Sequence, residues 1–253
     1  MSRSITESES EAILTQILVI PDCHLKPWLF EKATKLMKAE PIDGAVCLMD
    51  LADDFGKSHN RELYIETYNA AIQFAKDYPS TLWCYGNHDL SYIWGKPETG
   101  FNPDMRTLVY NKIEELKSCL PSENQLAYIH KIDKVLFMHG GLSDFFVRRW
   151  VTPSHQKAIG KTIAEINEMG SALMWSSSSP IWYRPQFAPD SSPSRLFRGG
   201  KYLQVVGHTP VKDVILEGGV LSCDTFSTYS DGTPYGSQKF CVVDTKALTF
   251  RTC

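Results

Sequence analysis

The sequence predicts an α/β fold in which a parallel sheet, covered by helices, is followed by a second, mostly antiparallel sheet. In residues 17–85, short apolar runs alternate with segments of helical spacing, and this β-α-β-α-β order is typical of parallel sheets. Residues 203–251 instead hold several short apolar runs separated by turn residues, which is typical of antiparallel strands. No repeat and no linker divides the 253 residues, so we expect one domain.

The predicted parallel sheet begins with three strands and two helices. Residues 17–20, 45–49 and 81–85 are short apolar runs that contain β-branched or aromatic side chains, as buried strands do. Residues 28–38 carry apolar side chains at helical spacing, and residues 61–78 form the next expected helix. Each helix would connect two neighbouring parallel strands.

Residues 104–200 are expected to contain two helices and a hairpin. Residues 104–120 have the pattern of a long amphipathic helix, and residues 156–174 form another helical stretch. Residues 127–130 and 135–138 are expected to be the strands of the hairpin. Residues 176–200 are rich in Ser, Pro and Arg, and a loop of that length is more often functional than idle. The tail strands are expected at residues 203–206, 214–216, 220–223, 240–243 and 248–251.

The composition excludes several classes of protein. A net charge of -3 argues against a broad nucleic-acid interface, and no apolar run is long enough to cross a membrane, so we expect neither partner. Seven cysteines without a C-x-x-C pair indicate a reducing compartment, and we expect a cytoplasmic protein. Residues 1–11 are rich in Ser and Glu and are expected to form a disordered tail that lacks the layout of a signal peptide. The sequence does not predict an oligomeric state.

Polar side chains directly follow five of the predicted strands. Because ligands bind at the carboxyl ends of strands in parallel α/β sheets, we expect these side chains to converge. Carboxylate, imidazole and amide donors suit manganese, iron and zinc. The sequence therefore predicts a metal centre at this edge. The side chains are Asp22, His24, Asp50, Asp53, Asn87, His88, His139 and His208.

The same positions carry a resemblance to a known family. Asp22-x-His24, Asp50-x-x-Asp53, Gly86-Asn-His-Asp89, His139-Gly-Gly and Gly207-His-Thr resemble, in order and context, the motif series of the calcineurin-like metallophosphoesterases. The series most resembles the branch with serine/threonine protein phosphatases, bacterial protein phosphatases and diadenosine tetraphosphatases. The resemblance implies a four-layer α/β/β/α sandwich of two mixed β-sheets flanked by helices, the metallo-dependent phosphatase fold, with residues 12–253 as the metallophosphoesterase domain.

The resemblance also implies a pair of divalent transition-metal ions, for which we expect manganese first, with iron or zinc as alternatives. One ion would be held by Asp22 and His24 and the other by three side chains, with Asp50 bridging both. The ligands of the second ion would be Asn87, His139 and His208.

The implied reaction is attack on phosphorus by a hydroxide that bridges the two ions, without a covalent enzyme intermediate. His88 would protonate the leaving group, and Asp53 would orient the imidazole and favour its protonated form. Asn87 would also reach an oxygen of the phosphate.

The sequence departs from the family pattern at two positions. Met49 precedes the bridging aspartate where the family usually has glycine, and Asp54 stands where the phosphatase branch often has a phosphate-binding arginine. Arg184 is our first candidate to replace that arginine, because a guanidinium matches two phosphate oxygens. Arg195 and Arg198 are weaker candidates in the same loop.

The favoured function is therefore hydrolysis of a phosphomonoester, carried by a phosphoprotein or a small phosphorylated molecule. One alternative is hydrolysis of the phosphoanhydride of a dinucleoside polyphosphate, which aromatic stacking near Trp182 and Tyr183 would favour. An alternative of another class is a non-catalytic interaction scaffold on the same fold. A nuclease is disfavoured by the acidic balance of charges.

Overall fold

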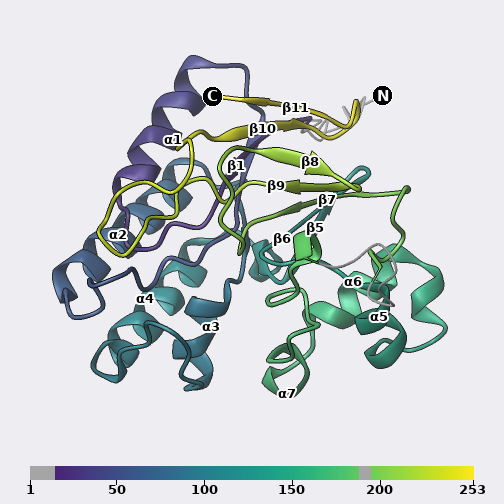
Figure 1. Ribbon diagram of the computed structural model, residues 1–253, viewed down its shortest axis with the longest axis horizontal. Coiled ribbons are helices and arrows are strands. Elements are labelled where there is room, and N and C mark those ends of the chain that lie inside the picture. Colours follow the sequence, from purple (N-terminus) through teal and green to yellow (C-terminus); the bar gives the residue numbers. More distant parts are fainter. Residues whose placement is uncertain (1–14, 188–194) are drawn as a thin grey trace, which may run out of the picture.

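The computed structural model describes residues 15–187 and 195–253, which form two mixed β-sheets flanked by helices (Figure 1). The predicted disordered tail, residues 1–11, lies outside the described residues, as does part of the predicted 176–200 loop. The predicted α/β class with two mixed sheets is confirmed.

The first sheet has six strands and contains the predicted parallel core. β1 to β4 are parallel. Beyond β1, β10 pairs with β1 in the antiparallel direction, and β11 pairs antiparallel with β10. In spatial order the strands are β11 (Thr249–Thr252), β10 (Cys241–Asp244), β1 (Gln16–Ile20), β2 (Gly44–Cys47), β3 (Leu82–Cys84) and β4 (Leu126–Ala127).

The second sheet has five strands. Its centre is parallel, because β7 pairs in parallel with both β6 and β9, whereas β5 and β8 are antiparallel edges. In spatial order the strands are β5 (Ile129–Ile132), β6 (Val135–Met138), β7 (Leu203–Val206), β9 (Val220–Ser222) and β8 (Ile215–Glu217).

Helices cover the outer face of each sheet, as Figure 1 shows. The helices that pack on the first sheet are α1 (Trp28–Ala39), α2 (Arg61–Asp77) and α4 (Arg106–Cys119), with α3 (Asn87–Trp94) beside α4. Those on the second sheet are α5 (Asp144–Trp150), α6 (Ile159–Asn167) and the short α7 (Ser171–Met174). Single turns of 3-10 helix lie at Pro103–Met105, Glu123–Gln125, His155–Lys157 and Pro185–Phe187.

The hydrophobic core has three parts, one for each interface between layers. In β1, Leu18 and Ile20 point to the helices of the first sheet, while Ile17 and Val19 point to the second sheet. This division follows from the alternation of side chains along a strand. Phe137 of β6 faces the first sheet in the same way. Because both faces of the central strands are buried, these strands are continuous apolar runs.

Three expectations about elements are wrong in detail. The two C-terminal strands do not join the second sheet, because β10 pairs with β1. Residues 127–130 are not one strand: β4 ends in the first sheet and β5 begins in the second, and the Asn167 side chain accepts hydrogen bonds from Tyr128 N and Ile129 N at this switch. The helix expected at 156–174 is divided, since Ala158 is extended and Gly170 begins a separate turn.

In the two described ranges, no helix is both long enough and apolar enough to cross a bilayer.

Candidate metal centre and active site

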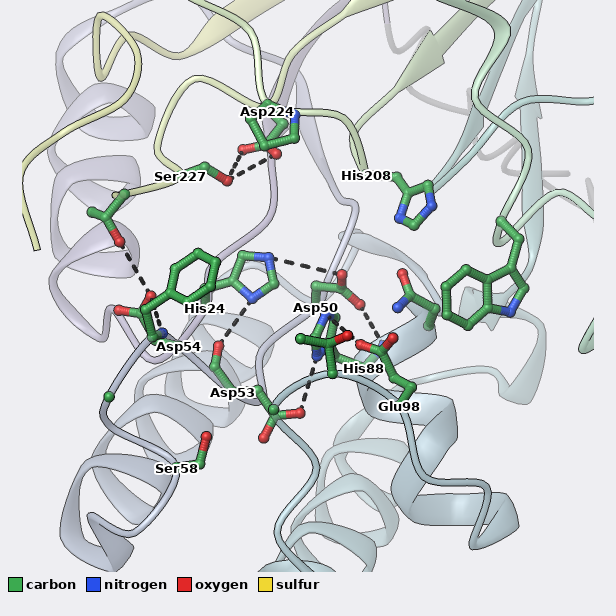
Figure 2. Close-up of a pocket in the computed structure, with 18 of the residues that line it drawn as sticks. His24, Asp50, Asp53, Asp54, Ser58, His88, Glu98, His208, Asp224 and Ser227 are labelled. Carbon is green, nitrogen blue, oxygen red and sulfur yellow. Dashed lines mark hydrogen bonds and ion pairs between the residues drawn. The ribbon is translucent and has the colours of Figure 1, made fainter. Parts of the chain in front are cut away.

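Side chains from several strand ends converge on one cavity, among them His24, Asp50 and His208 (Figure 2). Asp22 and His24 follow β1, Asp50 follows β2 and Asn87 begins α3 after β3. His139 follows β6 of the second sheet, and His208 follows β7. The predicted edge is thus formed by both sheets together.

The backbone around these residues is held in unusual conformations. His24, Met49, Asp50, Asp53 and His208 have φ angles of 43°, 56°, 43°, 59° and 60°. This left-handed region costs a non-glycine residue roughly 1–2 kcal/mol. Met49 therefore keeps the turn for which the family uses glycine, and its fully buried side chain contributes to the core in return. The backbone of the two strand ends stays paired, since His24 N donates to Asp50 O at 2.7 Å.

Four atoms that could be metal ligands lie close together at a buried site between the sheets. His139 Nε2 lies 3.1 Å from Asp50 Oδ2, 3.0 Å from Asn87 Oδ1 and 3.2 Å from His208 Nδ1. His139 Nδ1 lies 2.9 Å from the Leu48 carbonyl oxygen, to which it can donate. That bond fixes the tautomer whose Nε2 lone pair can bind a metal. At most one proton, on His139 Nε2, is available for three acceptors, which is an arrangement that a cation fits.

The ionisation of the histidines reflects this crowding. Burial lowers the pKa of His208 to about 2, together with the charge of His139. Burial also opposes the charged form of His139, but the charges of Asp50 and Asp22 outweigh it and raise the pKa of His139 to about 9. The proton on His139 therefore compensates part of the negative charge of Asp50 and Asp22, and a bound divalent ion would compensate that charge fully.

A second group of donors lies on the other side of Asp50. His24 Nε2 is 3.9 Å from Asp50 Oδ2, and His24 Nδ1 is 2.9 Å from the Asp53 carbonyl oxygen, which again leaves Nε2 available. Asp22 accepts from His208 N through Oδ2, and its buried Oδ1 has no hydrogen-bond partner within residues 15–187 and 195–253. A Cβ on Gly207 would lie 1.9 Å from that oxygen, so this position requires glycine.

Two sets of side chains could each hold a metal ion. Asp50 belongs to both, with His139 and His208 on one side and His24 and His88 on the other. The inclusion of His88 differs from the role that the resemblance implies for it. The orphaned oxygen of Asp22 offers a further buried carboxylate ligand, in a side chain whose other oxygen lies 4.0 Å from His139 Nδ1. The donor set therefore fits a pair of divalent ions with Asp50 between them.

His88 and Asp53 form the expected pair. His88 Nδ1 lies 3.0 Å from Asp53 Oδ2, and Asp53 Oδ1 accepts hydrogen bonds at 2.5 Å from Tyr64 and from Tyr92. Burial opposes the protonated form of His88, but the charge of Asp50 and contacts with Asp53 and Glu98 raise its pKa well above the usual value. Asp53 is thus rigidly oriented and keeps a proton on His88.

These side chains open into a cavity of about 350 Å³. Asp54 lines it, but its carboxylate lies 2.6 Å from Lys57 Nζ and 3.5 Å from Lys26 Nζ. Thr228 also donates to Asp54 at 3.1 Å. Two lysines therefore neutralise the carboxylate that replaces the usual arginine.

Arg184 lines the same cavity. Its Nη1 donates to the carbonyl oxygen of His208 at 2.5 Å and to Thr209 Oγ1 at 3.3 Å, which places the guanidinium beside the metal-binding group. Arg198 instead donates to the carbonyl oxygens of Gln156 and Lys157. Neither Arg195 nor Arg198 is among the residues that line this cavity.

Of the aromatic candidates, Trp182 lines the cavity and Tyr183 does not. The Trp182 ring is perpendicular to His208 and to Trp175, at centroid distances of 5.6 Å and 5.1 Å. It is therefore packed edge-to-face between two rings. Tyr183 is buried beside Gly141.

Two carboxylate side chains that line the cavity, those of Asp224 and Glu98, have no place in the sequence prediction. Asp224 follows β9 by two residues, so the strand-end rule applied to the predicted 220–223 strand would have found it. Burial raises the pKa of Asp224 to about 6. Glu98 lies in an irregular segment after α3, and no pattern in the sequence marks it.

Comparison with known proteins agrees with this geometry. The sequence profile described as calcineurin-like phosphoesterase matches residues 15–229. A cold-active protein-tyrosine phosphatase from a psychrophilic Shewanella species superposes with a TM-score of 0.59 and 20% identity, over 94% of this chain and 80% of that chain. A protein serine/threonine phosphatase from Saccharomyces cerevisiae, similar to human phosphatase PP5, superposes with a TM-score of 0.54 and 18% identity. The superposition covers 93% of this chain and 74% of that chain.

At these identities the two structures show a common fold. No curated protein sequence matches the chain. The family profile, however, covers most of its length, including every strand-end motif. The chain therefore belongs to the calcineurin-like phosphoesterase family, whose members hydrolyse phosphate esters.

Proposed function

We propose that the protein hydrolyses phosphomonoesters, using two divalent metal ions held between the sheets. The observation that carries the proposal is that two possible metal-binding groups share Asp50, and that Asp50 lines one cavity together with the His88–Asp53 pair. When bound, such ions neutralise phosphate charge and lower the pKa of a water between them. Manganese is the first candidate, with iron and zinc as alternatives.

The proposed ligands follow the division that the family resemblance implies. Asp50 is shared, and each ion has imidazole and oxygen ligands of its own. The side chains are Asp22, His24 and Asp50 for one ion, and Asp50, Asn87, His139 and His208 for the other.

Two side chains are proposed to bind the phosphate directly. Arg184 and Asn87 both line the cavity next to the metal-binding group. Arg184 keeps guanidinium nitrogens beyond Nη1 for the phosphate oxygens, and such forked pairs are the strong form of recognition. Asp53 holds the His88 ring, and His88 holds the proton that the leaving oxygen needs.

The direct test is a manganese-loaded sample assayed side by side on p-nitrophenyl phosphate, a phosphopeptide and diadenosine tetraphosphate. We expect release of phosphate from the two monoesters at a higher kcat/KM than cleavage of the dinucleotide. A preference for the dinucleotide would favour the phosphoanhydride reaction, and no turnover with manganese, iron or zinc would favour a scaffold.

Replacing His88 by Asn should lower kcat about 10²- to 10⁴-fold for phenyl phosphate, because the proton donor is lost. The effect should be much smaller for p-nitrophenyl phosphate, whose leaving group needs no proton. The amount of bound metal, measured by mass spectrometry, should stay close to that of the wild type. His59→Asn is the matched control, since His59 does not line the cavity. Equal losses on both substrates would contradict the assigned role.

Replacing Arg184 by Lys should lower kcat/KM for phosphomonoesters about tenfold to a hundredfold, the value of a hydrogen bond to a charged group. The loss arises because an ammonium cannot match two phosphate oxygens. Steady-state kinetics and the inhibition constant of inorganic phosphate measure it. Arg198→Lys, at a guanidinium that binds backbone carbonyls outside the cavity, should leave both unchanged. An unchanged inhibition constant in Arg184→Lys would remove Arg184 from the phosphate site.

A cytoplasmic location stays a prediction. All seven cysteines are free thiols in the structure, in keeping with a reducing compartment.

A further inference from the structure

The side chain of Glu98 covers the nitrogen from which His88 would donate its proton. Glu98 Oε1 forms an ion pair with His88 Nε2 at 2.8 Å, and the Glu98 side chain is 13% exposed. The other ring nitrogen, Nδ1, faces Asp53. In the part of the chain that the structure describes, no other group donates a hydrogen bond to Glu98 Oε1. The imidazole thus lies between two carboxylates, and Nε2 becomes open to a leaving group only when Glu98 moves.

The backbone of Glu98 is held in place, so its side chain has to move alone. Phe101 N donates to Glu98 O at 3.0 Å and closes a turn. Gly100 has a φ of 92° at the third position of that turn, where a type II turn requires glycine. A Cβ on Gly100 would lie 3.1 Å from Asp53 Cβ, so the turn packs directly on the pair it covers. Rotation of the Glu98 side chain would expose His88 Nε2 while the turn at residues 98–101 stays closed.

The negative charge of Glu98 is compensated differently from the charges of Asp54 and Asp224, which also line the cavity. Asp54 is paired with two lysines, and Asp224 accepts a bifurcated hydrogen bond from the Ser227 hydroxyl, which lies 2.9 Å from both carboxylate oxygens. Glu98 is paired with His88, and the leaving group must replace that carboxylate at Nε2. Once rotated, the carboxylate stays beside the leaving group without that counter-charge. Arg184 donates to the carbonyl oxygen of His208, and its guanidinium interacts with Glu98 only through space, as one of several nearby carboxylates.

We propose that Glu98 is a specificity-determining residue that admits uncharged or cationic leaving groups to His88 and disfavours anionic ones. The inference rests on the proposed phosphomonoesterase function and narrows its substrate class. A nucleoside polyphosphate leaving group would place several negative charges beside Glu98. A phosphorylated side chain next to a basic group would instead supply the counter-charge that Glu98 loses when it leaves His88.

The test compares three aryl phosphates of similar size whose leaving groups differ in charge. They are phenyl phosphate, 4-carboxyphenyl phosphate and 4-(aminomethyl)phenyl phosphate, assayed with the manganese-loaded wild type, Glu98→Gln and Glu98→Ala. Because each variant is compared with wild type on the same substrate, the intrinsic reactivity of the substrate cancels. Glu66→Gln, at an exposed position of α2, is the matched control. Thermal unfolding and bound metal are measured for every variant.

We expect both Glu98 variants to raise kcat/KM for the carboxylated substrate, relative to phenyl phosphate, by about fivefold to thirtyfold, for unit charges ~8 Å apart at an effective dielectric of ~20–40. The aminomethyl substrate should change by a similar factor in the opposite direction. Diadenosine tetraphosphate should follow the carboxylated substrate.

An equal change on all three aryl phosphates, in variants that fold and bind metal as the wild type does, would overturn the proposal for Glu98. Absence of turnover of any aryl phosphate by the metal-loaded wild type would instead overturn the proposed phosphomonoesterase function. The two failures are therefore distinguishable in one set of assays.

Discussion

Replacing Asp50 by Asn is expected to lower kcat/KM for p-nitrophenyl phosphate about 10³-fold or more, at the upper end of the loss of one preorganised electrostatic group. Asp50 Oδ2 lies 3.1 Å from His139 Nε2 and 3.9 Å from His24 Nε2, so one carboxylate serves both metal-binding groups. An amide keeps the shape but supplies one neutral oxygen. Bound metal should therefore fall from two ions to at most one in elemental analysis.

The stability of the metal-free Asp50→Asn protein separates a functional from a structural loss. In the metal-free protein the charge of Asp50 pairs with His139 and His88, whose pKa values it raises. Removing that charge should lower the melting temperature of the metal-free protein but leave a single cooperative unfolding transition, because two largely buried imidazoles lose their counter-charge. Asp104→Asn, at an exposed position outside the cavity, is the control. A kcat/KM within threefold of wild type would show that Asp50 does not bridge two ions.

Removing metal with a chelator should abolish hydrolysis, and manganese, iron or zinc should restore it. Three acceptors around a single possible proton at His139 Nε2, together with the unpartnered Asp22 Oδ1, leave the site dependent on a cation. Calcium should restore little, because it prefers oxygen ligands over the imidazoles that dominate this site. The ion that gives the highest kcat at saturation is the best candidate for the native metal.

Metal removal should also be visible without any substrate. At a hundredfold excess over Kd, an ion that binds only the folded state stabilises it by about 2.7 kcal/mol. For a chain of this length that corresponds to roughly 5–11 °C in Tm. The increase should shrink in Asp50→Asn. Full activity after exhaustive chelation, with no change in Tm, would contradict the metal site.

Much of the fold was predictable because hydrophobic periodicity is local. The β1 sequence shows that both of its faces are buried, and the helices of the first sheet show one apolar face each. The positions of Asp22, Asp50 and His208 followed from a second local rule, that ligands gather at strand ends. Both rules can be applied without knowing which strands pair in the sheet.

Pairing between distant segments was not predictable in this way. The pairing of β10 with β1 joins residues more than 200 positions apart, and a β10 of the same composition could have extended the second sheet equally well. The free energy that distinguishes the two arrangements comes from packing between complete layers. A single sequence does not display that energy.

The α/β class, the polar side chains at strand ends and the residues expected to bind metal could be predicted from the sequence, since each depends on spacing along a short segment. How charges meet in the cavity depends instead on the folded arrangement of the layers. That arrangement places Lys26 and Lys57 on Asp54, two tyrosines on Asp53, and Glu98 over His88. The physical reason is that an ion pair depends on distance in space, and these partners come from loops and helices whose approach no periodic pattern records.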